Sequence, residues 1–217
     1  MQSPTPLSDL QRDQLARYAD ELARMTRRVN LISPATVREI PERHIAHSLA
    51  IAQRAFPSGA TVVDWGSGGG LPAVPLAVAF PDVQFVAVDA VGKKMDAVRL
   101  FARRLGLANL EAWHGRAEAY DGPAPHYAVS RATAPLADLW GWFAASRQLA
   151  AEPSVELAIS DGDWAPGLVC LKGGDLTREI ADLHATAPQL DVATHELAER
   201  LGPSWSDKVL LHVTDGA

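Results

Sequence analysis

The sequence contains one cysteine and no long apolar run, and both shortages limit what the protein can be. Cys170 stands alone, so an intrachain disulfide framework of the kind found in exported domains is excluded. The apolar stretch at residues 71–80 is broken by Pro75 and is much shorter than the roughly 18 residues of a membrane span. The first residues show no charged-then-apolar signal pattern. We therefore expect a cytoplasmic protein with no membrane segment.

The chain also lacks an excess of positive charge. Its net charge is −6 and its pI is about 5.6, whereas phosphate contacts usually require a basic surface. Two stretches reverse this sign: residues 24–48 hold five arginines against two glutamates, and residues 92–104 hold five lysines and arginines against one aspartate. If both border one pocket, they form a basic entrance on an acidic body. Two solvated helix faces are the alternative.

A glycine-rich loop follows a strongly apolar stretch. Residues 62–72 read Val-Val-Asp-Trp-Gly-Ser-Gly-Gly-Gly-Leu-Pro, the pattern of a strand, a loop and a proline suited to the first turn of a helix. Glycines allow positive φ and carry no side chain, so the backbone can approach a small ligand closely. A second apolar stretch, residues 84–89, ends in Asp89, which is placed to accept hydrogen bonds from ribose hydroxyls.

Two classes of cofactor are compatible with this layout. Dinucleotide folds use G-x-G-x-x-G/A, which residues 68–73 satisfy formally, although the first glycine of that motif should follow the strand directly. The pattern Asp64-x-Gly66-x-Gly68 instead fits the first motif of S-adenosylmethionine (SAM) methyltransferases. SAM has no pyrophosphate, and its ammonium and sulfonium groups favour a nearby acid such as Asp64. A strand-to-helix turn without a ligand is the third possibility.

The spacing of apolar residues predicts one α/β unit behind a helical extension. Ser8-x-x-Gln11 is a capping box that starts an N-terminal helix with one buried stripe, and a second short helix is predicted over residues 34–56. We predict strands near 61–64, 84–89, 109–113, 126–130, 167–172, 190–197 and 208–214, and helices near 72–80, 91–105, 134–150 and 174–185. The last two strands have little between them, so they should pair as an antiparallel hairpin.

The predicted architecture is therefore a Rossmann-like, mostly parallel seven-stranded sheet with a C-terminal antiparallel hairpin, the arrangement of class I SAM-dependent methyltransferases. Hydrophobic residues make up 47% of the 217 residues, which is ample for its core. We place an N-terminal helical cap at residues 1–58 and the SAM-binding methyltransferase domain at residues 59–217, as one compact unit.

Several short motifs occur in an order that resembles one family. They are Asn30-Leu31-Ile32, Arg43-His44-Ile45, Asp64-x-Gly66-Ser67-Gly68-x-Gly70-Leu71-Pro72-x-x-Pro75-Leu76, Asp89-x-x-Gly92-Lys93-Lys94, His114-Gly115-Arg116-Ala117-Glu118, Ser130-Arg131-Ala132 and Leu171-Lys172-Gly173. The set resembles the bacterial 16S rRNA guanine-N7 methyltransferases known as RsmG or GidB, across roughly residues 7–214.

The resemblance implies a set of cofactor contacts and an RNA substrate. Gly66, Leu71, Ala117, Glu118 and Arg131 fall where relatives contact SAM, and Asp64, Gly68 and Asp89 join them from the loop and strand patterns. The implied substrate is 16S rRNA or the small ribosomal subunit, and we expect a monomer. Glu118 could instead belong to a polar strand end, and Arg131 could form a surface ion pair.

Methyl transfer to guanine N7 makes few demands on side chains. The nitrogen already carries a lone pair, so no general base and no catalytic side chain is expected, and holding the reacting atoms in line supplies the rate. Positioning candidates near the pocket mouth are Asn30, Arg43, His44, Ser130 and Arg131. No metal is expected, because His44 and His47 are not accompanied by a third ligand.

Two features depart from the family pattern. Relatives generally carry an Asp-Ser pair after Arg-His-Ile, where this chain has His47-Ser48, so an imidazole replaces a fixed anion. Residues 151–164 form a longer and more acidic segment than the expected turn, and we interpret it as a surface excursion. These departures leave two alternatives open: a SAM-dependent methyltransferase with a non-RNA substrate, and a non-catalytic SAM-fold binding protein.

Overall fold

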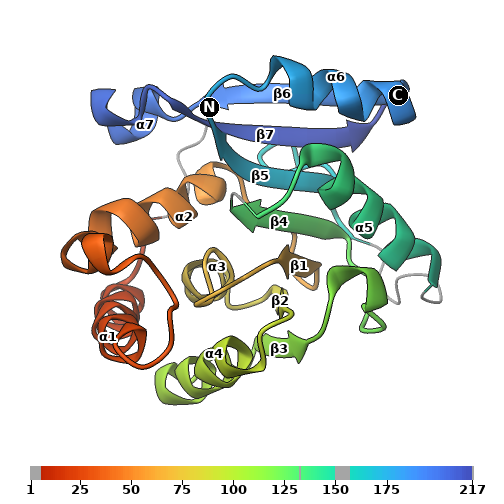
Figure 1. Ribbon diagram of the computed structural model, residues 1–217. Helices are drawn as coiled ribbons and strands as arrows, with labels where there is room; N and C mark the ends of the chain where they lie inside the picture. The colour runs from red at the N-terminus through yellow and green to blue at the C-terminus, as the bar shows by residue number, and fades with distance from the viewer. Residues whose placement is uncertain (1–5, 132, 150–156, 217) are drawn as a thin grey trace.

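The computed structural model describes residues 6–131, 133–149 and 157–216. Its strands form one seven-stranded sheet in the order β3-β2-β1-β4-β5-β7-β6, with helices on both faces (Figure 1). The strands are β1 (Thr61–Trp65), β2 (Gln84–Asp89), β3 (Leu110–His114), β4 (Tyr127–Arg131), β5 (Gly167–Gly173), β6 (Leu190–Glu196) and β7 (Lys208–Asp215). The longer helices are α1 (Asp9–Thr26), α3 (Ala73–Ala79), α4 (Gly92–Leu105), α5 (Leu136–Leu149) and α6 (Thr177–Thr186).

The sheet divides the core into two layers because its central strands are buried on both sides. Val62 of β1 packs with α1, α3 and α4, whereas Val63 and Trp65 pack with α5 and α6. Figure 1 shows the same division, with α1, α3 and α4 on one side of the sheet and α5 and α6 on the other. A central strand of this kind consists mainly of apolar residues, so a polar residue within it requires an internal partner.

The first five strands are parallel, so their carboxyl ends meet at one edge of the sheet. β1 pairs in parallel with β2 and β4, β2 with β3, and β4 with β5. β7 then inserts between β5 and β6 and pairs antiparallel with both. The predicted hairpin is confirmed, although its connection also contains two helical turns, α7 (Ala198–Leu201) and η5 (Pro203–Trp205).

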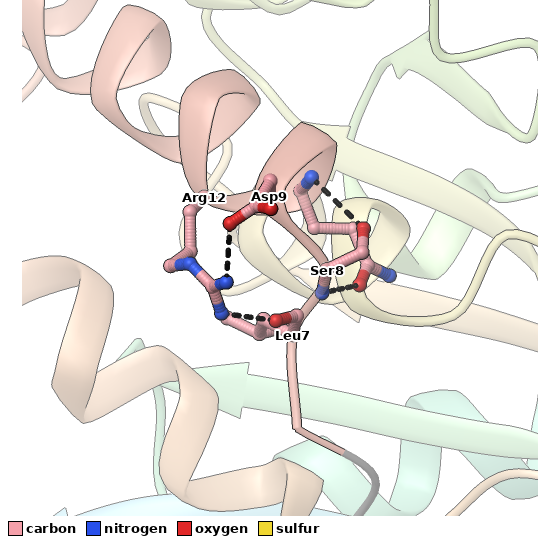
Figure 2. Close-up of polar contacts among 5 residues, drawn as sticks. Leu7, Ser8, Asp9 and Arg12 are labelled. Carbon is pink, nitrogen blue, oxygen red and sulfur yellow. Dashed lines mark hydrogen bonds and ion pairs between the residues drawn. The ribbon is translucent and has the colours of Figure 1, made fainter.

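The start of α1 is held by the predicted capping box (Figure 2). The Ser8 hydroxyl accepts from the backbone N–H of Gln11 at 3.3 Å, and the Gln11 side chain accepts from the backbone N–H of Ser8 at 2.8 Å. Arg12 contacts the Asp9 carboxylate at 2.6 Å and donates to the carbonyl of Leu7. These contacts satisfy backbone groups that the first helical turn leaves without partners.

The prediction of one short helix over residues 34–56 was wrong in detail. The segment contains four short pieces: η1 (Pro34–Glu39), the π-helical η2 (Ile40–Ala46), α2 (His47–Leu49) and η3 (Ala50–Gln53). The backbone of Glu39 leaves the helical region, with φ of −117° and ψ of 25°, and Pro41, which lacks a backbone N–H, lies in the first turn of the next piece. The boundary between a cap at 1–58 and a domain at 59–217 stays a prediction, and both parts contribute to one apolar core.

A short 3₁₀ turn, η4 (Ala117–Ala119), lies between β3 and β4. In the described part of the chain, no helix combines the length and apolar character needed to cross a bilayer. The other predicted strands and helices agree with the structure to within about three residues at their ends.

Candidate functional site

The loop between β1 and α3 is shaped by three glycines with positive φ. Gly66, Gly68 and Gly70 have φ of +69°, +58° and +90°, values that side-chain-bearing residues rarely adopt. Space is limiting as well, since a Cβ on Gly66 would lie 1.9 Å from the side chain of Thr133. The Thr133 hydroxyl donates a hydrogen bond to the Gly66 carbonyl at 3.3 Å. The loop therefore tolerates no side chain at Gly66, and Leu71 at its end is buried.

Helix α1 packs against the glycine loop and supports it. The Tyr18 hydroxyl, which is fully buried, donates to the carbonyl of Gly69 at 2.8 Å. Leu22 and Leu31 approach so closely that a Cβ on Gly69 would lie 2.9 Å and 3.1 Å from them. The N-terminal extension is thus part of the framework of the loop. Sequence reasoning did not assign Tyr18 this role, because its place in the buried stripe indicates only a core residue.

Asp64 lies at the end of β1, buried beneath the loop. Its Oδ2 accepts from the backbone N–H of Ala73 at 3.0 Å, whereas its Oδ1 has no hydrogen-bond partner among the described residues. Burial raises the pKa of Asp64 to about 7, and the nearby Ser67 side chain and the Ala73 N–H offset part of that rise. A carboxylate so placed is poised to hold a nearby positive charge, because a cation would stabilise its ionised form.

Asp89 ties the loop to the end of β2. Its Oδ2 accepts from the backbone N–H of Gly68 at 3.0 Å, and its Oδ1 accepts from that of Val91 at 2.8 Å. Lys94 of α4 lies 3.6 Å from Oδ2. Each carboxylate oxygen can accept a second hydrogen bond, so Asp89 can still receive ribose hydroxyls while it fixes the loop.

Val91 is a feature of this site that sequence reasoning missed. It is one of the exposed large apolar residues of the described chain, with 44% of its surface accessible. It lies two residues after Asp89 and offers an apolar contact beside that carboxylate. The available signal was a large apolar residue in the turn after a strand-terminal acid.

Arg131, at the end of β4, is held by a chain of hydrogen bonds. Its Nη1 donates to Nδ1 of His44 at 2.9 Å, and Nε2 of His44 lies 2.8 Å from the hydroxyl of Thr36. A guanidinium only donates, so Nδ1 must be unprotonated and Nε2 must carry the hydrogen that Thr36 accepts. The Thr36 hydroxyl in turn donates to the carbonyl of Ser33 at 3.0 Å.

His44 is therefore neutral and fixed in one tautomer. Burial lowers the pKa of His44 to about 4, and the charge of Arg131 lowers it further in the same direction. Burial likewise lowers the pKa of the Arg131 guanidinium, which nevertheless remains charged. Arg131 forms no ion pair with a carboxylate within the described ranges, so its charge is available to an anionic ligand.

The other predicted positioning residues occupy different environments. Asn30 and Arg43 are exposed, and Arg43 pairs with Glu39. Ser130 is fully buried, and its hydroxyl donates to the carbonyl of Trp65 at 3.0 Å, so it joins β4 to β1 and is not presented to a ligand.

Two more predicted contacts, Ala117 and Glu118, lie in η4 at the edge where β3 ends, with Glu118 exposed. The structure thus gathers the glycine loop, Asp64, Asp89, Ala117 and Arg131 at one edge of the sheet, with His44 turned inward. Ala132, from the Ser-Arg-Ala motif, lies outside the described residues.

His47, the first residue of the His47-Ser48 pair, is buried against Trp205 with ring centroids 4.7 Å apart. Burial lowers the pKa of His47 to about 3, with a further contribution from Arg131. Its Nε2 has no partner among the described residues. The imidazole is therefore a neutral packing group in this structure and does not supply a counter-ion to Arg131.

The acidic segment at 151–164 is only partly described, since residues 150–156 lie outside the described residues. Its remainder lies at the opposite edge of the sheet from the glycine loop, because it leads into the amino end of β5. Arg54 donates to the carbonyls of Asp161 and Asp163 there, and the indole of Trp164 donates to the carbonyl of Ile51 at 2.9 Å. These two acids therefore do not oppose an anion at the glycine loop.

The two basic stretches are placed differently from each other. Arg27 and Arg28 are exposed where α1 ends, just before the segment that contacts the glycine loop. Lys93 and Lys94 lie in the first turn of α4, and Lys94 is 3.6 Å from Asp89. Arg104 lies about 16 Å further along that helix and pairs with Glu21 at 2.5 Å. Only the first residues of the stretch at 92–104 therefore belong to the same edge as the loop.

Among the described residues, no cluster of three or more His, Cys, Asp or Glu side chains is arranged to hold a metal ion. Cys170 is buried in β5, and burial raises the pKa of its thiol to about 12, which keeps it protonated.

Comparison with known proteins decides the family. The family model for rRNA small subunit methyltransferase G, GidB, matches residues 11–150. A ribosomal RNA small subunit methyltransferase G from Salinibacter ruber is 53% identical over 193 residues, which cover 88% of this chain and 86% of that protein. The chain belongs to the rRNA small subunit methyltransferase G family. A relative of the same name from Chlorobium luteolum is 36% identical over 94% of this chain and 82% of its own length.

Solved structures show the fold at low sequence identity. A SAM-dependent methyltransferase from Aquifex aeolicus aligns with a TM-score of 0.54 and 13% identity, over 90% of this chain and 96% of its own. A ribosomal protein L11 methylase from Lactobacillus delbrueckii aligns with a TM-score of 0.56 and 14% identity, over 79% and 77% of the two chains. The protein thus has the class I methyltransferase fold and is a member of a methyltransferase family.

Proposed function

We propose that this protein transfers the methyl group of SAM to N7 of a guanine in 16S rRNA. The observation that carries the proposal is membership of the rRNA small subunit methyltransferase G family, at 53% identity to a relative of that name over 88% of the chain. The motifs that resemble guanine-N7 enzymes support the finer assignment of the atom. We further propose that the chain acts as a monomer, with residues 1–58 as a cap on residues 59–217.

The residues at the sheet edge fit SAM. Three positive-φ glycines give a close backbone approach, and the buried Asp64 retains an unpartnered oxygen. Arg131 supplies a charged donor without a carboxylate partner in the described ranges. The carboxylate of Asp64 would pair with the ammonium of SAM, and the guanidinium of Arg131 would pair with its carboxylate.

The adenosine end of SAM would lie over β2 and β3. Asp89 would accept from the ribose hydroxyls, and the exposed Val91 would contact a face of the adenine ring. The backbone of Ala117 and the carboxylate of Glu118 would meet the adenine edge, where directional hydrogen bonds distinguish this base. Because these groups come from different strand ends, only the folded sheet brings them within reach of one ligand.

The chemistry then depends on alignment. When bound, SAM supplies an electrophilic methyl group on a sulfonium, and guanine N7 attacks it with its existing lone pair. The protein needs no base for this step, in agreement with His44, whose unprotonated nitrogen already accepts from Arg131, and with the buried Ser130. Holding two reactants in an attack geometry can supply roughly 7–11 kcal/mol in well-oriented cases.

RNA would approach over the basic groups at the same edge. Arg27, Arg28 and Lys93 are available there, with Asn30 and the partly neutralised Arg43 beside them. The protein as a whole is acidic, so its own hold on RNA is weak. A substrate within a structured ribosomal particle would supply further contacts.

The proposal is tested by transfer of labelled methyl from SAM to small subunits and to deproteinised 16S rRNA, both taken from bacteria that lack the family enzyme. The modified base is located by cleavage mapping. N7-methylguanine at one site is the expected product. Transfer to neither substrate, by protein shown to bind SAM, would refute the proposal and favour a different acceptor or a non-catalytic role.

A further inference from the structure

The side chain of Arg131 reaches the sheet edge with one hydrogen-bond partner among the described residues, Nδ1 of His44. An arginine side chain has several rotatable bonds, so an unsupported guanidinium must be ordered by its ligand and binds more weakly. The contact with His44 orders it in advance. His44 is itself 9% exposed and fixed at its other nitrogen by Thr36, so the support is rigid.

The residues that hold Arg131 belong to the N-terminal segment, whereas Arg131 itself belongs to the methyltransferase domain. Thr36 lies in η1, His44 in the π-helical η2, and Arg131 at the end of β4. In η2 the neighbouring Arg43 is exposed and paired with Glu39, while His44 points inward. π-Helical turns occur often at functional sites, where they redirect a side chain that a regular helix would place elsewhere.

We infer that His44 is a positioning residue for the cofactor: held by Thr36, it fixes the Arg131 guanidinium where that group receives the carboxylate of SAM. The inference rests on the proposed function, because it takes SAM as the ligand of Arg131. It replaces the expectation that His44 faces RNA. It also gives the N-terminal segment a direct effect on cofactor affinity.

The assignment requires a neutral His44 and one tautomer. Only an unprotonated Nδ1 can accept from the guanidinium, and only then does Nε2 carry a hydrogen for Thr36. A glutamine at this position offers a carbonyl acceptor and an amide donor on one side chain, so it can replace both contacts in part. An alanine replaces neither.

The test is the affinity of the full-length protein for SAM and for decarboxylated SAM, which differ only in the carboxylate, measured by isothermal titration calorimetry without RNA. We expect His44→Ala to weaken SAM binding about ten-fold, the scale of one hydrogen bond to a charged group. The affinity of the same variant for decarboxylated SAM should fall by less than about two-fold. His44→Gln should recover part of the loss, and Thr36→Val should cause a smaller loss with the imidazole still present.

Two comparisons separate positioning from a structural role. Glu42→Ala changes an exposed residue of the same π-helical segment and should leave both affinities unaltered. In an Arg131→Ala background, His44→Ala should have no further effect on SAM, because its partner is gone. Equal losses for the two ligands, or no loss for either, would overturn the inference while leaving the proposed function intact. A wild-type protein that binds neither ligand would overturn both.

Discussion

Replacing Asp64 with asparagine should remove a loss of stability that the wild type undergoes as the pH rises, and it should weaken SAM binding. Asp64 is fully buried, and its pKa is raised to about 7 from an ordinary value of 3.8. Its neutral form is therefore favoured by folding. The folded state loses that advantage as the pH rises from about 4 to about 7, because over this range the carboxyl group ionises in the unfolded chain while the buried one keeps its proton.

The size of the effect follows from the two pKa values. The full difference corresponds to about 4 kcal/mol of unfolding free energy. Between pH 5 and pH 8 the wild type should lose about 3 kcal/mol relative to Asp64→Asn, which has no charge to bury. Any constant penalty from placing an amide at this site cancels, because only the change with pH is compared.

The assay is urea unfolding followed by tryptophan fluorescence at several pH values between 5 and 8. Asp20→Asn, which removes an exposed carboxylate of α1, serves as the control and should change the pH dependence by less than about 0.5 kcal/mol. A stability difference between Asp64→Asn and wild type that does not vary with pH would refute the reasoning. SAM affinity should fall at least about ten-fold in the same variant, because an anion beneath the ammonium is lost.

Two further changes test the loop and the RNA approach. Gly66→Ala should destabilise the protein by about 1–3 kcal/mol and weaken SAM binding, because it combines a positive φ with a clash against Thr133; an unchanged melting temperature would contradict this. Arg27→Ala with Arg28→Ala should lower RNA affinity and reduce the slope of log affinity against log salt by about 1 to 2. Arg12→Ala, at the far end of the same helix and paired with Asp9, should leave that slope unchanged.

Local patterns in the sequence were sufficient for much of the fold. The capping box at Ser8, the glycine loop and the alternation of strands with helices each depend on neighbouring residues, so they could be recognised without a structure. The short connection between the last two strands correctly indicated an antiparallel pair. Residues 34–56 were harder, because Pro41 and burial against α1 broke one expected helix into differently wound pieces.

The sequence predicted candidate residues for the site but not the contacts between them. Arg131 and His44 were both candidates, but their hydrogen bond joins residues 87 positions apart and no local pattern indicates it. Ser130 was a reasonable candidate as a polar residue at a strand end. Its hydroxyl nevertheless donates to the backbone carbonyl of Trp65, because both faces of a central strand are covered by other elements.

The sequence by itself determined the glycine loop, the order of strands and helices and the family, since these depend on short motifs and on apolar spacing along the chain. Only the tertiary structure decided which side chains gather at the carboxyl ends of the strands, which form internal hydrogen bonds, and which residues of the basic stretches lie near the glycine loop. The physical reason is that burial and hydrogen bonding between distant segments set the charge state and direction of each side chain. Asp64 and His44 both show this, because their pKa values and contacts arise from groups brought together by the fold.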